Sequence, residues 1–266
     1  MANGDEVSNN RILFRDYISG TSATIKLKVP EGSNSVLLKN LYSSCDPYML
    51  GRMTLSDSYV AAFTPGSPIT GYAVSEVLDS GNPNFEKGDY VWGFAGWEQY
   101  SLIKNPDPSS LRKINYTDVP LSYHTGILGM PGMTAYVGFN VLASPKMGES
   151  VYVSDASGAV DRLLADLTAT LKRYFSKGID IYFENPDGVH NLTQLVLKRV
   201  RMQGFNVFDH YHLYPEFMEL MKQYFMDEKL VYVEDMVEGL ESAPAALIGL
   251  FTGQNVGKQV VKVSHE

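Results

Sequence analysis

The sequence predicts an α/β protein in two lobes, one rich in strands and one built from alternating strands and helices. Short stretches of strand propensity, separated by turn residues, occupy the first third of the 266-residue chain. From residue 134 onward strands alternate with helices, and a last short strand follows near the end. Strands first and alternation afterwards are typical of α/β architecture. With 44% hydrophobic residues, the chain can build a sizeable core.

The strand-rich lobe is expected to take in residues 1–133. Residues 24–29 alternate between apolar and polar side chains, as a half-buried strand does. Gly81-Asn82-Pro83 and Glu86-Lys87-Gly88 supply turns. Short strands at close spacing favour a compact barrel or sandwich, with further strands at residues 12–14, 35–42, 69–78 and 89–92.

The second lobe has the order of a nucleotide-binding unit. After a helix at residues 132–139, a predicted strand at 150–154 runs into Ala156-Ser157-Gly158-Ala159 and then into a helical repeat at 161–175. A strand, small residues and a helix in this order begin a Rossmann unit. The remaining elements are predicted as a strand at 179–183, a basic helix at 191–202, a strand at 205–208, a helix at 215–225 and a strand at 258–263.

The turn at residues 151–159 is the strongest local motif. Small residues let the backbone approach a pyrophosphate, and the N-terminus of the next helix contributes N–H donors. The usual fingerprint has more glycines, however, because only Gly158 is well placed and Asp161 stands where a small residue is expected. Taken by itself, the motif fits a cofactor-binding turn and an ordinary strand-to-helix turn equally well.

Two of the 17 tyrosines are candidates for contact with a substrate. Tyr48 follows Pro47 in an expected loop, where an exposed phenol can donate a hydrogen bond to a carbonyl. The alternative, which is commoner, is a tyrosine at the edge of the core with its hydroxyl in water. Tyr72, which follows Thr70 and Gly71, has the same two interpretations.

Composition argues against several classes of partner. A net charge of −8 disfavours nucleic-acid binding, and no apolar run approaches the ~20 residues that span a bilayer. The single cysteine, Cys45, and five histidines provide no four-ligand zinc set, and no pattern indicates a metal held by carboxylates. The first ten residues are polar and acidic, unlike a secretory or mitochondrial signal. We therefore expect a cytoplasmic protein without metal, membrane or nucleic-acid partners.

Four segments together resemble plant alkenal double-bond reductases, which are zinc-free medium-chain reductases related to zeta-crystallin and leukotriene B4 dehydrogenases. The matching blocks extend over almost the whole chain. The resemblance implies a GroES-like substrate (catalytic) domain of residues 1–133 and 213–266, with a truncated Rossmann-type cofactor domain of residues 134–212. The segments are residues 45–49 (CDPYM), 63–69 (FTPGSPI), 129–136 (GMPGMTAY) and 239–258 (GLESAPAALIGLFTGQNVGK).

The resemblance also implies a reaction, the NADPH-dependent reduction of the α,β double bond of enals and enones. Hydride goes to the β-carbon, while a hydrogen-bond donor stabilises negative charge on the carbonyl oxygen. Tyr48 and Tyr72 would line the substrate pocket, and Tyr48 is the expected donor. The residues implied in cofactor binding are Pro47 and Tyr48 with Met133 and Thr134 at the nicotinamide, Ala156, Ser157, Gly158, Ala159 and Val160 at the pyrophosphate, and Asn185, Phe208 and Asn255.

The chain departs from the family pattern in two places within the cofactor domain. Val160 passes within a few residues to a helix that follows later in the family, and Asn185 runs directly into residues 186–191. The two gaps remove on the order of 80 residues, in keeping with βαβ units of about 30 residues each. The adenosine half of the NADPH site is lost, and weaker cofactor binding is expected.

Two alternatives to an active enal and enone reductase follow. One is a non-catalytic, truncated isoform or dimerising scaffold, since family members use the segment at 205–208 near their homodimer interface. The other is a quinone reductase of the same superfamily.

Overall fold

The computed structural model describes residues 6–14, 19–54, 58–108, 110–147, 192–199 and 203–265. The chain divides into two compact units, of which the first joins Met1–Pro131 to Tyr232–Glu266 and the second is Gly132–Val231. The predicted strand at 150–154, the turn at 151–159, the helix at 161–175, the strand at 179–183 and Asn185 all lie outside the described residues.

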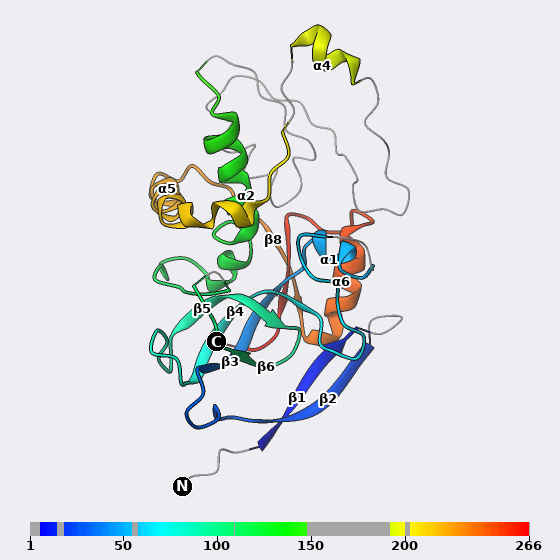
Figure 1. Ribbon diagram of the computed structural model, residues 1–266, viewed down its shortest axis with the longest axis vertical. Helices are drawn as coiled ribbons and strands as arrows, with labels where there is room; N and C mark the ends of the chain where they lie inside the picture. The colour runs from blue at the N-terminus through cyan, green and yellow to red at the C-terminus, as the bar shows by residue number, and fades with distance from the viewer. Residues whose placement is uncertain are drawn as a thin grey trace. The chain divides into compact units, whose positions relative to one another are not determined.

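The first unit is organised by a seven-stranded sheet in the order β7-β5-β4-β3-β9-β8, with β6 also paired to β3 (Figure 1). Its strand pairs are antiparallel except β8 with β9, which are parallel. The strands are β3 (Ser35–Ser44), β4 (Thr70–Ser80), β5 (Tyr90–Gly96), β6 (Tyr100–Lys104), β7 (Leu111–Lys113), β8 (Glu234–Glu238) and β9 (Lys258–Lys262).

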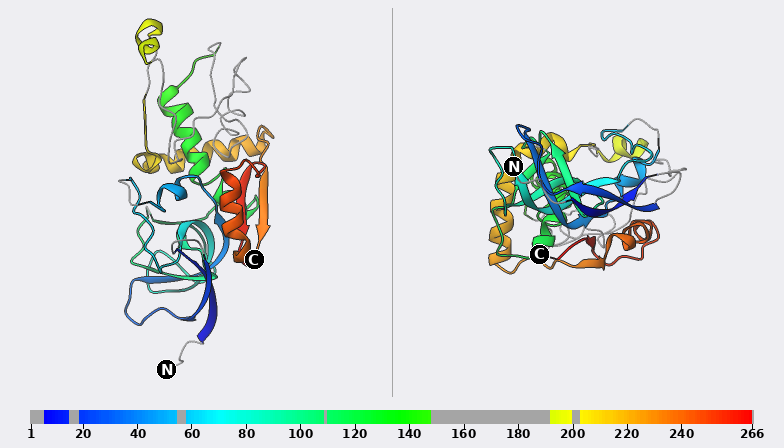
Figure 2. Two further views of the ribbon diagram at one scale, coloured as in Figure 1. Left: turned by 90° about the vertical axis from the view of Figure 1, so that its right-hand side faces the viewer. Right: turned by 90° about the horizontal axis from the view of Figure 1, so that it is seen from below.

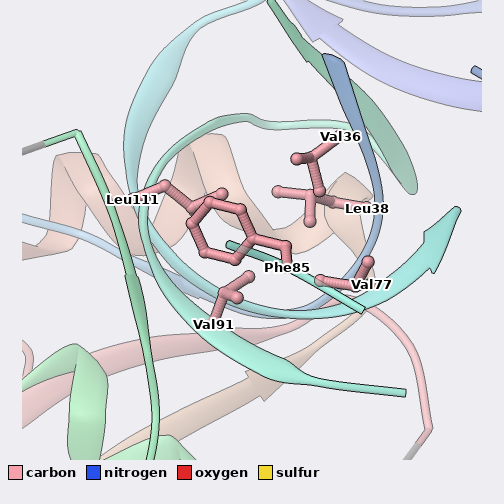
Figure 3. Packing of buried hydrophobic residues seen from close by; sticks show 6 residues of the cluster. All are labelled: Val36, Leu38, Val77, Phe85, Val91 and Leu111. Carbon is pink, nitrogen blue, oxygen red and sulfur yellow. The ribbon is translucent and has the colours of Figure 1, made fainter. Parts of the chain in front are cut away.

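Strand β3 is central because it changes partner along its length. Residues 35–39 pair with β6, whereas residues 42–44 pair with β9. Register shifts against β4 occur at Leu37/Leu38 and Asn40/Tyr42, and such bulges bend a strand. Nearly all of β3 is buried, and its apolar residues are at positions 36–38, 41 and 42. One cluster of the core packs on its first half and consists of Val36, Leu38, Val77, Phe85, Val91 and Leu111 (Figure 3).

A hairpin of β1 (Glu6–Leu13) and β2 (Ser19–Lys26) forms a separate two-stranded sheet. Isolated bridges join it to the rest of the first unit, Arg11 to Glu98 and Leu13 to Pro68. The C-terminal part of the unit runs from β8 through η4 (Leu240–Ser242) and α6 (Ala243–Leu250) to β9 (Figure 2, orange to red). A helix between β8 and β9 is the connection that two parallel strands require.

The described part of the second unit is helical. Helix α2 (Met130–Tyr136), at the junction of the two units, continues as the π-helix η2 (Val137–Ala143). The ring of Tyr136 packs on Phe217 of α5 (Tyr214–Met226), with centroids 5.6 Å apart. The basic helix is shorter than expected, since α4 (Thr193–Lys198) ends where Arg199 adopts a φ of 53°.

The strand predicted at residues 205–208 is wrong. These residues lead into a 3₁₀ helix, η3 (Val207–Leu213). The side chain of Asn206 accepts a hydrogen bond of 3.0 Å from the backbone N–H of Phe208 and so caps the first turn. This local bond favours the helical turn over an extended chain.

Candidate substrate site in the first unit

The candidate site begins at the short connection between β3 and helix α1 (Tyr48–Gly51). Pro47 precedes the helix with a φ of −57°, close to helical geometry, and its side chain is exposed. Tyr48 therefore starts a helix and does not lie in the loop predicted for it. Its side chain is only 9% exposed. The structure thus turns the phenol of Tyr48 into the protein.

A buried ion pair fixes this connection to the last strand. The Lys258 Nζ donates to Asp46 Oδ1 at 3.1 Å, to the Cys45 carbonyl at 2.6 Å and to the Gln259 carbonyl at 3.2 Å. The hydroxyl of Ser44 donates to the second carboxylate oxygen of Asp46 at 2.6 Å. All three protons of the ammonium group are thereby used, as a buried charge requires. Residues 45 and 46, which precede Pro47 and Tyr48, are therefore fixed by hydrogen bonds to Ser44 and Lys258.

Arg52 lies four residues after Tyr48, so the two side chains share a face of the helical turn. Burial lowers the pKa of the Arg52 guanidinium, and the neighbouring Tyr48 side chain opposes this shift. The guanidinium donates to the Ala61 carbonyl at 2.9 Å, the Thr70 carbonyl at 2.7 Å and the Thr70 hydroxyl at 2.9 Å. Its Cζ lies 4.1 Å from the centroid of the Phe63 ring, a cation–π distance. Arg52 is thus fixed between α1, residues 61–63 and the start of β4.

Tyr72 lies on β4 within an aromatic group. Its ring stacks on Trp92 with centroids 4.9 Å apart and an angle of 4°, and it packs on Phe94 at 4.4 Å. The Arg52 guanidinium lies 5.9 Å from the centroid of the same Phe94 ring. The contacts therefore run from Arg52, one helical turn after Tyr48, through Phe94 to Tyr72. The structure brings the two predicted tyrosines into one neighbourhood, with Tyr72 only 2% exposed.

Asn255 lies in the turn between α6 and β9, in the same unit. Its Nδ2 donates to the Gly257 carbonyl at 2.8 Å. Gly257 has a φ of 80°, and a Cβ there would lie 2.2 Å from the Val233 carbonyl oxygen. Only glycine fits this turn without strain, and the next residue is Lys258 of the buried pair. The turn therefore connects Asn255 to the same anchor that holds Pro47 and Tyr48.

The remaining predicted cofactor residues are divided between the second unit and the part of the chain outside the described residues. Met133, which is fully buried, and Thr134 lie on α2, and Phe208 lies on η3. Ala156, Ser157, Gly158, Ala159, Val160 and Asn185 fall outside the described residues. The cofactor candidates of the first unit are Pro47 and Tyr48, implied at the nicotinamide, and Asn255. They fit the group in kind, since an exposed ring, a phenol and an amide suit a heteroaromatic carboxamide.

Sequence reasoning missed Arg52, Asp46 and Lys258. The spacing of four residues between Tyr48 and Arg52 is a signal that could have found the first. Asp46 and Lys258 both fall within the segments that resemble the family, but 212 positions separate them. Among the described residues, no cluster of histidine, cysteine or carboxylate groups could hold a metal ion. In the same ranges, no helix has the length and apolar character that crossing a membrane requires.

Comparison with known proteins supports this view of the fold. Residues 23–113 match a family model described as the N-terminal domain of oxidoreductase. A 2-alkenal reductase (NADP(+)-dependent) of Nicotiana tabacum is 47% identical, with 98% of this chain and 99% of that protein covered. A (+)-pulegone reductase of Mentha piperita is 41% identical over 98% of this chain and 100% of its own. The crystal structure of CurA from Vibrio vulnificus in complex with NADPH superposes with a TM-score of 0.81 at 26% identity, covering 97% of this chain and 100% of that chain.

The fold and these matches define a medium-chain reductase with a GroES-like and a Rossmann-type domain. Within that class, the chain belongs to the family of alkenal double-bond reductases. The chain is shorter than its relatives. The alignment with the tobacco protein spans 343 positions, whereas this chain has 266 residues. At least 77 positions (343 − 266) therefore have no residue here.

Proposed function

We propose that the protein reduces the α,β double bond of enals and enones with NADPH, at reduced affinity for the cofactor. The observation that carries the proposal is the 47% identity to a 2-alkenal reductase across 98% of the chain. The proposal is also supported by the fixed position of the backbone before Tyr48, which Asp46 and Lys258 hold in place. We expect a small-molecule substrate, a cytoplasmic location and a homodimer, as the family resemblance implies.

When bound, NADPH would supply a hydride to the β-carbon of the substrate, and a proton from solvent would complete the reduction at the α-carbon. The chain's own contribution is a donor for the carbonyl oxygen, where negative charge develops as the double bond is reduced. The phenol of Tyr48 has the chemistry for this task, and Asp46 and Lys258 hold the backbone before it. A donor fixed in advance stabilises developing charge without the cost of reorganisation. Tyr72, packed among aromatic rings, would present an apolar wall to the rest of the substrate.

The reduced cofactor affinity follows from the missing positions in the cofactor domain. Each charge-assisted hydrogen bond between the protein and a phosphate of the adenosine half contributes about 1.5–3 kcal/mol to the binding free energy, and several such bonds would be missing here. The loss of several such bonds weakens binding by several orders of magnitude, because about 1.4 kcal/mol corresponds to a factor of ten. Of the candidates that lie in the first unit, Pro47 and Tyr48 belong to the nicotinamide end.

The two alternatives have less support. The scaffold was motivated by a strand at residues 205–208, and that segment leads into a 3₁₀ helix. For the quinone reductase, no residue of the described site favours a quinone over an enone. The enal and enone reductase therefore stands as the proposal.

Calorimetric titration of the purified protein with NADPH, and with NADH for comparison, tests the cofactor part of the proposal. We expect saturable binding of NADPH that is weaker than that of a full-length relative titrated in parallel. The variant Asn255→Ala should weaken binding further, whereas Glu238→Gln, on the exposed face of β8, should not. Affinity equal to that of the full-length relative would contradict the expected weakening. Absence of binding at millimolar NADPH would contradict the reductase itself.

A further inference from the structure

We infer that Tyr232 is a positioning residue for the cofactor, because it clasps together the two places where the chain crosses between the units and so fixes the start of α2. This inference rests on the proposed function and adds a residue to its site. Met133 and Thr134 of α2 are the residues implied at the nicotinamide. Tyr232 would act only through the backbone that precedes them.

The two crossings of the chain are close to well-defined elements of the first unit. The chain leaves this unit after Pro131 and returns to it at Tyr232. Helix α2 begins at Met130, so its first turn contains the first crossing. Strand β8 begins at Glu234, two residues after the second crossing. Contacts between Tyr232 and the residues just before α2 therefore join the two crossings within the first unit.

Tyr232 packs against the segment that leads into α2, which consists of the 3₁₀ helix η1 (Leu121–Thr125) and the turn after it. The rings of Tyr232 and Tyr123 meet edge to face, with centroids 4.7 Å apart. The Tyr232 hydroxyl is buried and lies against Gly126, where a Cβ would collide with it. The same Cβ would lie 3.0 Å from Cγ of Lys258. Only glycine allows this close approach of the phenol to the backbone.

A second contact joins the same two segments. The hydroxyl of Ser122, in η1, donates to Oε2 of Glu234 at 2.7 Å. Ser122 is only 3% exposed, and a hydrogen bond to a carboxylate is stronger than one between neutral groups. Tyr232 and Glu234 are two residues apart along an extended chain, so their side chains point to the same side. Together with Tyr123, Ser122 and Gly126 they form what we call the crossing clasp.

The turn between η1 and α2 is short and closely packed. The N–H of Leu128 donates to the Tyr123 carbonyl at 2.9 Å, and the N–H of Gly129 donates to the Gly126 carbonyl at 2.9 Å. A Cβ on Gly129 would collide with the backbone of η1. Only three residues separate Gly126 from Met130, and they have little freedom to absorb a movement. A displacement of Gly126 would therefore move the first turn of α2.

Tyr232 could instead be a purely structural residue of the first unit. Both roles predict a lower free energy of unfolding when its contacts are broken. Only a positioning role predicts that α2 loosens and that cofactor binding weakens in protein that is still folded. Val77→Ala is the matched control, because Val77 belongs to the core cluster of the same unit and its truncation leaves the crossing clasp untouched.

The kinetic test forces the clasp apart with Gly126→Ala. We expect kcat/KM for NADPH to fall by about 10- to 100-fold, mainly through KM, since a misplacement of about 1 Å can cost about 100-fold. Folded Val77→Ala should change it by less than about threefold. The double variant Gly126→Ala/Tyr232→Phe should recover part of the loss, because the displaced hydroxyl is gone. Ser122→Ala removes the second contact without adding an atom, and it serves as the test if Gly126→Ala does not fold.

Hydrogen exchange of the free protein, followed by mass spectrometry, tests the clasp without the cofactor. We expect the amides of α2 to exchange at least about tenfold faster in Gly126→Ala and Ser122→Ala than in Val77→Ala. Equal exchange at α2 in the three variants would overturn the clasp. Faster exchange with an unchanged KM for NADPH would overturn its positioning role. No turnover by the unmodified protein would overturn the proposed function and the positioning role with it, whereas the exchange rates would still decide whether the clasp exists.

Discussion

The Nζ of Lys258 lies 3.1 Å from Oδ1 of Asp46, and the two side chains are 2% and 3% exposed. The pair joins the first residue of the last strand, β9, to the connection that carries Pro47 and Tyr48. A buried ion pair is weak support for overall stability, since desolvation offsets its attraction. In this protein the pair instead fixes the position of the backbone next to Tyr48, the proposed donor.

Removal of one partner of this pair should be costly. Asp46→Asn leaves the Lys258 ammonium buried without a counter-charge, and we expect the free energy of unfolding to fall by about 3–5 kcal/mol. Urea unfolding followed by circular dichroism measures this change. Glu238→Gln breaks the exposed pair with Lys262, at 3.5 Å, and should cost less than about 1 kcal/mol. Equal losses in the two variants would show that the buried pair has no special role.

The turn before Lys258 should reject any side chain. In Gly257→Ala, a Cβ would lie 2.2 Å from the Val233 carbonyl oxygen, in addition to the strain of a φ of 80°. We expect a loss of about 3 kcal/mol or more, because backbone and side chain cannot both relax. Gly88→Ala is the matched control, since Gly88 has a φ of 89° and open space around its Cβ position. In Gly88→Ala, backbone strain alone should lower the free energy of unfolding by about 1–2 kcal/mol. A smaller decrease in Gly257→Ala than in Gly88→Ala would contradict this account.

Acid should destabilise the protein through His124. Burial lowers the pKa of His124 from 6.5 to about 4, although its hydrogen bond to the Tyr116 carbonyl opposes the shift. Between these values the unfolded chain binds a proton that the folded chain does not, so stability is lost as the pH falls below 6.5. From neutral pH to about pH 4.5 this contribution is on the order of 2–3 kcal/mol.

The variant His124→Gln isolates the contribution of His124 to the pH dependence of stability, because the glutamine amide N–H can replace the donor to Tyr116 and does not titrate. Urea unfolding of both proteins across this pH range should show a steeper loss in the unmodified protein. Parallel curves would mean that His124 is not the group that titrates.

Cys45 should be inert, although it lies three residues from Tyr48. Burial raises the pKa of its thiol to about 12, with Asp46 adding to the effect and Lys258 opposing it, and the residue is 1% exposed. Enals alkylate thiolates, and very little thiolate is present here at neutral pH. We expect alkylation by N-ethylmaleimide, followed by mass spectrometry, to be at least about a thousandfold slower than in the urea-unfolded chain. Rapid and stoichiometric labelling of the folded protein would contradict this expectation.

The sequence predicts the parts of the fold whose pattern is local. Residues 35–42 show strand propensity, and the structure confirms a buried strand there. Strand β8 was missed because its sequence, EDMVE, is mostly polar, and its extended form depends on pairing with β9. Strand β7 has three residues, too few for a periodic pattern. The segment at 205–208 looked like a strand from its apolar residues, but the cap at Asn206 decides its conformation.

In the candidate site, too, local sequence patterns predicted some residues and long-range contacts determine the rest. The two tyrosines were found from motifs, but their setting depends on residues that motifs do not connect. Lys258 and Asp46 meet across 212 positions, and only the pairing of β3 with β9 brings them together. Arg52 lies one helical turn after Tyr48, yet its hydrogen-bond partners, Ala61 and Thr70, lie beyond a loop. Long-range contacts of this kind follow from the topology of the sheet.

The most direct test of the account is the transfer of hydrogen from the cofactor to the substrate. The protein is incubated with trans-2-hexenal and NADPH that carries deuterium at both C4 positions of the nicotinamide, and the product is analysed by mass spectrometry and NMR. The account predicts hexanal with one deuterium at C3, formed slowly at saturating NADPH and lost in Tyr48→Phe. Deuterium at C1 in an allylic alcohol, or no deuterated product from protein that is demonstrably folded and saturated with NADPH, would contradict it.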